Sequence, residues 1–442
     1  MASTTMSSNS VLNPRTQYKE FAGAFGATLI SIGLPALLVV FYQLSNPRYH
    51  LEGIALDWDQ FTHFDKKWCC ICFDKQVWTY YIIWFTTLIF FDLALPGEHK
   101  KGVVLRDGTQ LGYKINGIAL SSLLIAILAT RYQLTLGKMP ELVYLYDHIL
   151  EFTATAVIFS FLLAVFVYVM SFVPLRTPNG KGTKERILAV GGNSGDVIYD
   201  WFIGRELNPR ILAWDIKLFC ELRPGMLLWL LLNLASMHHQ WLTYGEVSDS
   251  MWLVVGLQTF YIFDGVLNEE GCLTMMDITT DGFGFMLSFG DLALVPFAYS
   301  LQARYLAVHP VDLGLEYSIF IVLLGAIGFY IFKASNNQKS RFRQGQLQHM
   351  KSIQTERSTK LLVDGWWKLS QHINYFGDWI HALSWCLPTG FVTPLTYFYI
   401  IYFASLLIHR QTRDESKCRE KYGKAWEEYE KKVPYKIVPY IY

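Results

Sequence analysis

Long apolar stretches recur along this chain, separated by short polar segments. A helix needs about 20 residues to cross the hydrocarbon core of a bilayer. Runs of about that length cover 22–43, 77–95, 117–135, 152–173, 225–244, 251–267, 283–306 and 313–332. A last apolar region, 379–408, contains Pro388 and Gly390, which interrupt helices and divide it into two spans or a hairpin. The pattern predicts an all-α polytopic membrane protein with nine or ten transmembrane helices.

Composition agrees with a chain that lies mostly in lipid. Hydrophobic residues make up 52% of the 442 residues and charged residues only 17%. The net charge of +1 gives no general reason to bind nucleic acid. Cys69, Cys70 and Cys72 crowd one segment between spans, and no second pair of ligands follows at a zinc-site spacing. We therefore expect ordinary thiols there and assign no metal.

Basic residues predict the orientation of the spans, because cytoplasmic loops retain Lys and Arg. Two alternate loops hold most of them, at Lys100, Lys101, Arg106 and Lys114 and at Lys184, Arg186, Arg205 and Arg210. We expect both loops, the N-terminus and the basic segment 333–357 to face the cytosol. The expected organisation is a polar tail (1–21), a transmembrane helical bundle with a ligand pocket (22–332) and a C-terminal part that includes the last hairpin or two spans (333–442).

A polar stripe marks the sixth span. Tyr261, Asp264 and Asn268 are spaced i, i+3 and i+7, which places them on one face of a helix. Further carboxylates follow at Glu269, Glu270, Asp277, Asp281 and Asp291. Ionisable residues in membrane helices are costly, so the stripe is a candidate proton donor with its partner. The alternative is an interhelical hydrogen-bond cluster that only stabilises the bundle.

The chain changes character after residue 332. Lys333, Lys339 and Arg343 lie near Trp366 and Trp367 in the sequence. Cations beside aromatic rings suit a nucleotide, since the cations pair with phosphates and the rings stack on bases. The same residues also suit a cytosolic anchor with interfacial tryptophans. Composition does not separate these two interpretations.

Several longer motifs do separate them. The segment 407–423, LIHRQTRDESKCREKYG, resembles the C-terminal signature of the sterol reductase family. Further similar segments are 195–210, 221–225 (ELRPG), 280–285 (TDGFGF) and 372–378 (HINYFGD). The segments 95–97 and 104–116 are similar to the fungal-type branch that reduces the double bond at ring carbon 14 of a sterol. The resemblance extends from about residue 96 to residue 442.

This resemblance implies an NADPH site in the C-terminal part. The implied contacts are Lys339, Arg343, Leu362, Trp367, Asn374, Tyr375, Asp414, Cys418, Arg419, Glu420, Lys421, Tyr422 and Tyr429. The chemistry of Lys339, Arg343 and Trp367 suits phosphates and rings. Asp414 would repel phosphates, so we expect it to orient an Arg or to accept from ribose or carboxamide. Cys418 is expected to pack rather than to react.

The resemblance also implies a reaction, reduction of the 14(15) double bond of an 8,14-diene sterol in ergosterol biosynthesis. Protonation of the diene gives an allylic cation, and hydride then completes the reduction. We expect Tyr261 to be the acid, held by Asp264, because a buried phenol avoids a buried charge. Protonated Asp277, Asp281 or Asp414 are the competing donors. The substrate would enter from the bilayer, and the family implies the endoplasmic reticulum membrane.

Other functions stay open at this point. A sterol reductase acting on ring carbon 7 or on the side chain would share most of these motifs. The C-terminal part also resembles membrane isoprenylcysteine methyltransferases, whose cofactor S-adenosylmethionine has no phosphates for Lys339 and Arg343 to bind. A sterol-binding protein without catalysis is a further alternative, which NADPH binding would exclude.

Overall fold

The computed structural model describes residues 12–45, 67–176 and 183–442. In these ranges seven helices are long and apolar enough to cross a membrane: Gly23–Leu44, Trp68–Ala94, Gly117–Leu134, Ile149–Met170, Ile216–Tyr244, Asp249–Leu267 and Leu315–Arg343. Each matches an apolar run of the sequence. The chain is therefore a mostly helical polytopic membrane protein, and the count of nine or ten spans stays a prediction. Residues 1–11 of the predicted polar tail lie outside the described residues.

The apolar run 283–306 forms a broken helix. It consists of α14 (Phe285–Phe289), a π-helical turn η2 (Gly290–Leu294), α15 (Val295–Tyr299) and α16 (Leu301–Leu306). Pro296 is the second residue after the π turn and removes one backbone donor from the helix. Inserted turns of this kind are frequent at functional sites. The break places Asp291 within a widened stretch of backbone.

The last apolar region is divided where the sequence predicts. Helix α18 (Ile373–Ser384) is followed by the short 3-10 turns η4 (Leu387–Thr389) and η5 (Leu395–Tyr397) and then by α19 (Phe398–Tyr422). Gly390 adopts φ 68°, a left-handed conformation that glycine takes without steric cost. The predicted interruption at Pro388 and Gly390 is confirmed.

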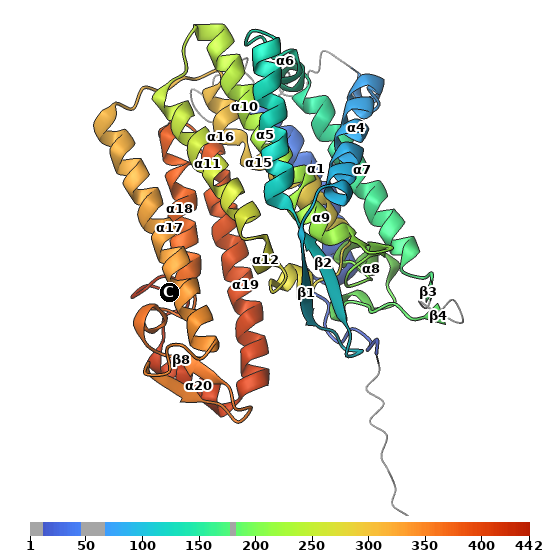
Figure 1. The fold of residues 1–442 in the computed structure, drawn as a ribbon, viewed down its shortest axis with the longest axis vertical. Coiled ribbons are helices and arrows are strands. Elements are labelled where there is room, and N and C mark those ends of the chain that lie inside the picture. Colours follow the sequence, from blue (N-terminus) through green and yellow to red (C-terminus); the bar gives the residue numbers. More distant parts are fainter. Residues whose placement is uncertain (1–11, 46–66, 177–182) are drawn as a thin grey trace, which may run out of the picture. The chain divides into compact units, whose positions relative to one another are not determined.

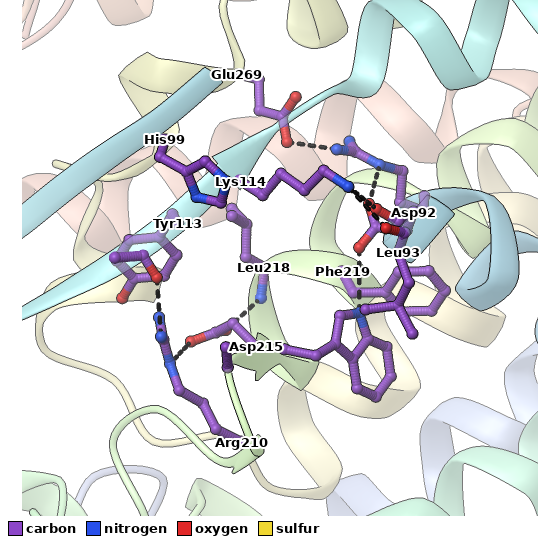
Figure 2. Close-up of a pocket in the computed structure, with 14 residues that line it drawn as sticks. Asp92, Leu93, His99, Tyr113, Lys114, Arg210, Asp215, Leu218, Phe219 and Glu269 are labelled. Carbon is purple, nitrogen blue, oxygen red and sulfur yellow. Dashed lines mark hydrogen bonds and ion pairs between the residues drawn. The ribbon is translucent and has the colours of Figure 1, made fainter. Parts of the chain in front are cut away.

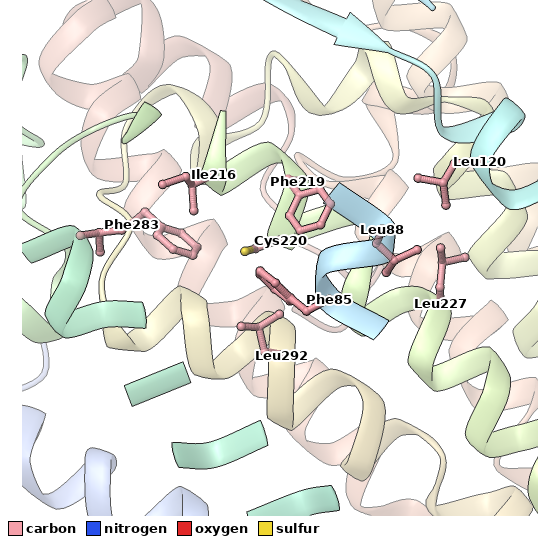
Figure 3. Close-up of a cluster of buried hydrophobic side chains, with 10 residues drawn as sticks. Phe85, Leu88, Leu120, Ile216, Phe219, Cys220, Leu227, Phe283 and Leu292 are labelled. Atoms are coloured by element: carbon pink, nitrogen blue, oxygen red, sulfur yellow. The ribbon is translucent and has the colours of Figure 1, made fainter. Parts of the chain in front are cut away.

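The chain forms two compact units. The first contains residues 1–239 and 259–304, and the second contains 240–258 and 305–442. The helices α10 (Pro224–Tyr244) and α11 (Asp249–Leu267) contribute to both. In the first unit, α4 (Lys75–Ala94), α5 (Gly117–Leu134), α9 (Ile216–Leu222) and α10 converge on a buried apolar cluster shown in Figure 3. This cluster contains Phe85, Leu88, Leu120, Phe219, Leu227, Phe283 and Leu292.

In the second unit, α17 (Leu315–Arg343) and α18 lie side by side (Figure 1). A Cβ at Gly328 would lie 2.5 Å from the backbone nitrogen of His381, and one at Gly377 would lie 2.6 Å from that of Phe332. Small residues at such contacts let helix backbones approach closely in membranes. The glycine of the HINYFGD segment thus has a packing role.

Four short antiparallel hairpins accompany the helices, which the all-α prediction did not include. They pair β1 (Glu98–Val104) with β2 (Gln110–Ile115), β3 (Leu175–Arg176) with β4 (Thr183–Lys184), β5 (Arg210–Ile211) with β6 (Trp214–Asp215), and β7 (Ser352–Gln354) with β8 (Lys360–Leu362). The first turns at Asp107 and Gly108, and Gly108 has φ 78°. An Asp-Gly pair is a strong hairpin signal. Hydropathy, which predicts the spans, gives no signal for this hairpin.

The two basic loops of the first unit lie together, as the orientation argument predicts. Lys184 forms an ion pair with Asp107, and Arg106 donates to the carbonyl of Leu188. The β1–β2 hairpin, β3 and β4 lie at one end of this unit (Figure 1). The chain near the N-terminus joins them, because Asn13 Nδ2 donates to the carbonyl of Arg186 at 2.9 Å.

Glycines in the similarity motifs sit at backbone contacts between segments distant in the sequence. Gly204 has φ 95°, and a Cβ there would lie 2.3 Å from the carbonyl carbon of Gly282. A Cβ at Gly225 would lie 1.6 Å from the carbonyl oxygen of Asp291. The ELRPG segment at the start of α10 therefore packs directly on the π turn.

This contact predicts the effect of a single methyl group. We expect Gly225→Ala to destabilise the protein by about 3 kcal/mol, the upper part of the usual range for overpacking, because backbone atoms must move. Thermal unfolding in detergent, with folded yield, measures the change. Gly290→Ala is the matched control, since a Cβ there meets nothing within 4 Å. An equal Tm for both variants would show that the contact does not constrain the fold.

Candidate functional site

The end of α17 brings a lysine onto a buried tryptophan in the second unit. Lys339 Nζ lies 3.9 Å from the ring centroid of Trp367. Trp367 is 2% exposed, and its Nε1 donates to the carbonyl of Ser335 at 2.9 Å. This ring is therefore fixed against α17, and the lysine is held over it by a cation–π contact. Lys339 and Trp367, which are 28 positions apart in the sequence, are therefore adjacent in the structure.

The loop that carries Trp367 is built by local hydrogen bonds. Gly365 has φ 58°, and its N–H is capped by Asp364 Oδ1 at 2.8 Å. The N–H of Trp366 donates to Gln338 Oε1 of α17 at 2.9 Å. Leu362 and Trp367 then pack in one apolar cluster together with Phe342, Ile373 and neighbouring side chains. Leu362 and Trp367, both implied by the resemblance, are thus brought together.

Helix α18 adds a polar group beside this loop. Asn374 Nδ2 donates to Asn336 Oδ1 at 3.2 Å. Asn374 Oδ1 is buried and has no hydrogen-bond partner within the described residues. An unmade hydrogen bond of a buried acceptor costs roughly 1–3 kcal/mol. A ligand that donates a hydrogen bond here would remove that cost.

His372 is a residue of this site that the sequence analysis did not single out. Its Nε2 lies 3.8 Å from Asp414 Oδ2, and its ring stacks on Tyr375 with centroids 4.8 Å apart. Burial lowers the pKa of His372 to about 4, although the Asp414 carboxylate acts in the opposite direction. The imidazole is therefore neutral near pH 7. Its position at the start of the HINYFGD segment was the available signal.

Helices α19 and α20 (Lys424–Lys432) complete the site. Cys418 and Tyr422 pack with Tyr429, Trp426 and Ile353. Burial raises the pKa of the Cys418 thiol to about 11; Asp414 adds to this rise, and the charges of Lys339, Lys421 and Arg343 oppose it. The thiol is protonated near neutral pH. Four charged residues of the implied cofactor site therefore lie within electrostatic range of Cys418: Lys339, Arg343, Asp414 and Lys421.

Two of the implied contacts, Arg419 and Glu420, stay predictions, and both side chains are exposed. Arg419 Nη2 forms ion pairs with Glu415 at 2.9 Å and Glu430 at 2.8 Å, and Glu420 is exposed. Burial acts to raise the pKa of Glu415, but hydrogen bonds from Lys436, Gln411 and Arg419 prevail and lower it to about 2. Arg419 thus belongs to an ion-pair network that joins α19 to α20 and to the segment after it.

The polar stripe lies in the first unit. Tyr261 packs beside Trp229, with ring centroids 6.2 Å apart, in an apolar cluster that includes Ile262. Asp264 Oδ1 accepts from Asn268 Nδ2 at 3.0 Å. The helical spacing therefore does place the carboxylate and the amide in contact, and it leaves the phenol in apolar surroundings.

The carboxylates after the stripe have different partners. Glu269 is 1% exposed; it accepts from the N–H of Gly117 at 2.8 Å and pairs with Arg223. Glu270 pairs with Lys100 at 3.1 Å. Glu269 is structural, because it is buried against a cation. The Glu270 pair is exposed to solvent, where an ion pair contributes little.

Asp277 and Asp281 lie on a loop that one buried lysine organises. Lys217 is fully buried, and its Nζ donates to the carbonyls of Asp277, Ile278 and Asp281 at 2.7, 3.1 and 2.8 Å. The loop backbone is thereby fixed. Asp291, in the π turn, has a buried Oδ2 without a hydrogen-bond partner among the described residues.

The candidate metal ligands of the sequence have other contacts. Cys69, Cys70 and Cys72 lie on the short helix α3 (Trp68–Cys72), where the sulfur atoms of Cys69 and Cys70 are 3.9 Å apart. Within 12–45, 67–176 and 183–442 no three His, Cys, Asp or Glu side chains gather as metal ligands would. No metal site is assigned.

Comparison with known proteins relates the whole chain to one family. Residues 15–442 match the sequence model of the Ergosterol biosynthesis ERG4/ERG24 family. The chain is 61% identical to Delta(14)-sterol reductase ERG24 of Candida albicans, over 98% of this chain and 100% of that protein. It is 58% identical to Delta(14)-sterol reductase ERG24 of Saccharomyces cerevisiae over the same shares. Delta(14)-sterol reductase LBR of Gallus gallus is 41% identical, over 95% of this chain and 64% of that protein.

The neutral, buried His372 predicts a pH dependence of stability. Its pKa is about 4 when folded against 6.5 for an ordinary histidine. Below about pH 6.5 the unfolded chain takes up a proton that the folded chain refuses, so stability falls as the pH drops toward 4 and is unaffected above 6.5. The groups facing His372 are Asp414, Lys339, Glu415 and Lys436.

We expect His372→Gln to lose this part of the acid sensitivity. The measurement is the Tm of the wild type and the variant in detergent between about pH 7.5 and pH 4.5. His349→Gln, at an exposed position of the same unit, should keep the wild-type slope. Parallel curves for wild type and His372→Gln would contradict the assignment.

Proposed function

We infer, from the Ergosterol biosynthesis ERG4/ERG24 family to which this chain belongs, that the protein is a membrane-bound delta(14)-sterol reductase. The observation that carries this conclusion is the full-length identity of 61% and 58% to two proteins of that name. This identity confirms the predicted membership of the sterol reductase family and of the branch that acts on ring carbon 14. The methyltransferase, the non-catalytic protein and the other reductase branches are set aside, because full-length relatives share the carbon-14 name.

The second unit is the proposed site of NADPH. Lys339, Arg343 and Lys421 bring three positive charges around Cys418, which suits the phosphates of a dinucleotide. The Trp367 ring and the buried, unpartnered Asn374 Oδ1 suit a ring and an amide donor. The residues therefore fit this cofactor. When bound, NADPH supplies the hydride that reduces the sterol.

Asp414 has a separate role in this proposal. Its side chain is 42% exposed and lies within electrostatic range of Lys339, and His372 contacts it from the buried side. A carboxylate among cations repels phosphate oxygens but accepts hydrogen bonds from hydroxyl or amide groups. We therefore assign Asp414 to the ribose or the carboxamide. His372 and Tyr375 orient it.

The first unit supplies the proposed proton. A carbon of the conjugated diene accepts a proton only from an acid held against it in a site without water. Tyr261 Oη is the proposed donor, and its ring packs in a cluster with Trp229 and Ile262. Asp264, held by Asn268, is proposed to orient the phenol and to balance the charge that develops on the sterol.

The competing donors differ in their surroundings. Asp277 and Asp281 stay alternatives on the loop held by Lys217. Asp414, the third alternative, belongs to the second unit and is assigned to the cofactor in this proposal. The sterol is proposed to enter from the bilayer, and the endoplasmic reticulum membrane is the proposed location, because sterol intermediates are apolar and partition into lipid.

Purified protein in detergent should convert an 8,14-diene sterol to the 14(15)-reduced product with NADPH, and less efficiently with NADH. Lys339→Gln should raise the KM for NADPH roughly tenfold, the effect of one lost charge-assisted hydrogen bond. Nicotinamide absorbance and mass spectrometry of the sterol follow the reaction.

Lys333→Gln is the matched control, since Lys333 lies on the same helix over Phe329 rather than Trp367. Equal KM values for the two variants would remove Lys339 from the cofactor site. Absence of any diene conversion by folded protein would overturn the proposed activity itself.

Replacement of the proposed acid separates chemistry from binding. Tyr261→Phe should lower kcat about 10²-fold to 10⁴-fold, the usual contribution of general acid catalysis, and leave NADPH affinity unchanged. Tyr299→Phe is the control, because Tyr299 also packs against Trp229, with ring centroids 5.4 Å apart. Near-normal turnover of Tyr261→Phe would transfer the role to one of the carboxylates.

A further inference from the structure

A charged pocket lies in the first unit, apart from the residues assigned to catalysis. It has a volume of about 300 Å³ and lies between the β1–β2 hairpin, the β5–β6 hairpin and α9 (Figure 2). His99 and Lys114 are directly paired across the β1–β2 hairpin, so their side chains share one face. Neither residue has a role in the proposed reaction.

The acidic groups of the pocket wall are already engaged. Asp92 accepts from Arg223 Nε at 3.2 Å and from Trp214 Nε1 at 3.1 Å. Asp215 accepts from Arg210 Nε at 2.8 Å and from the N–H of Leu218 at 2.9 Å. Each oxygen of these two carboxylates has its own donor.

Both oxygens of Glu269, the third carboxylate of the wall, also accept hydrogen bonds. Glu269 Oε2 accepts from the N–H of Gly117 at 2.8 Å, and its Oε1 accepts from Arg223 Nη2. All six carboxylate oxygens that line the pocket therefore accept a hydrogen bond from the protein. A cationic ligand would have to displace these bonds.

The donors of the wall are in excess. Lys114 Nζ has three N–H groups and donates to two carbonyls, those of Asp92 at 3.1 Å and Leu93 at 2.8 Å. The His99 ring makes no hydrogen bond to the described residues. Arg210 and Arg223 are engaged by the carboxylates of the wall, whereas Lys114 keeps a spare cationic donor. The His99 ring adds one donor nitrogen and one acceptor nitrogen. A lysine with a spare N–H beside carboxylates that are all engaged favours an anion.

The pocket lies at the level where membrane spans end. Asp92 and Leu93 belong to the last turn of the span Trp68–Ala94, and the spans Gly117–Leu134 and Ile216–Tyr244 begin beside it. Leu93, on the wall, is 56% exposed on a helix that the sequence places in lipid. Basic pockets between membrane helices on the cytosolic side bind lipid head groups.

We propose that this pocket, through His99 and Lys114, binds the phosphate of an anionic phospholipid head group whose acyl chains lie along α4 beside Leu93. The proposal is independent of the sterol chemistry, because a sterol nucleus carries no charge for these donors to bind. A free phosphate has the same charge but no acyl chain. The apolar exposure of Leu93 favours the lipid as the source.

The test uses the full-length protein in detergent, delipidated and titrated with three probes: phosphatidylinositol, phosphatidylcholine and inorganic phosphate. Phosphatidylinositol should raise the Tm in a saturable manner. Phosphatidylcholine should have a smaller effect, because its ammonium meets a wall that offers donors. Inorganic phosphate at the same concentration should have little effect.

His99→Glu places a carboxylate against the bound phosphate and should weaken the apparent affinity for phosphatidylinositol roughly tenfold. Lys101→Gln is the matched control, because it is also exposed on β1 and lowers the charge by the same amount, but it does not line the pocket. The diene reduction by both variants checks that they fold.

Three results would overturn the proposal. Equal affinities of His99→Glu and Lys101→Gln would remove the pocket as the binding site. Equal shifts with phosphatidylcholine and phosphatidylinositol would remove the preference for an anion. A saturable shift with inorganic phosphate that matches the lipid would leave an anion site but exclude the lipid as its source.

Discussion

The first unit depends on one buried guanidinium. Arg223 is 2% exposed, and it bonds Asp92 at the end of α4, Asn116 before α5 and Glu269 after α11. In lipid a helix end has no water to satisfy its polar groups, so a charge that bonds three ends at once holds them in register. Removing one partner of such a group typically costs about 3–5 kcal/mol, because the remaining charge stays buried. The ELRPG segment carries both Arg223 and Gly225. The contact of Gly225 with the π turn requires the segment to lie where Arg223 holds it.

The second unit is organised differently, by aromatic packing around a cation. Trp367 is held against α17 and lies under Lys339, and the loop that carries it is fixed by Asp364 and Gln338. His372 stays neutral near pH 7 because it is buried, and its Nε2 lies 3.8 Å from Asp414 Oδ2. In the proposed cofactor site, Asp414 would accept hydrogen bonds from ribose or carboxamide donors, while Lys339, Arg343 and Lys421 would bind phosphates.

Some elements of the structure were predicted from the sequence and others were not. Apolar runs predicted the seven long helices and the interruption at Pro388 and Gly390, because a span needs only length and hydropathy. The π turn at Asp291 and the β1–β2 hairpin were not predicted. The π turn depends on a contact with a distant residue, Gly225. The β1–β2 hairpin has a local signal in Asp107-Gly108, which hydropathy does not report. Of the implied cofactor residues, Arg419 stays a prediction, and its Nη2 forms ion pairs with Glu415 and Glu430.

The sequence by itself determined that this chain lies in a membrane, where its spans run and which family it resembles, since these follow from local hydropathy and from ordered motifs. Only the tertiary structure decided which polar residues are structural and which stay available for chemistry. Glu269 and Asp264 are both carboxylates near the end of one helix, yet the first is buried against Arg223 and the second is held by Asn268. Their roles differ because the partner of a charge, which comes from a distant segment, sets what that charge can do.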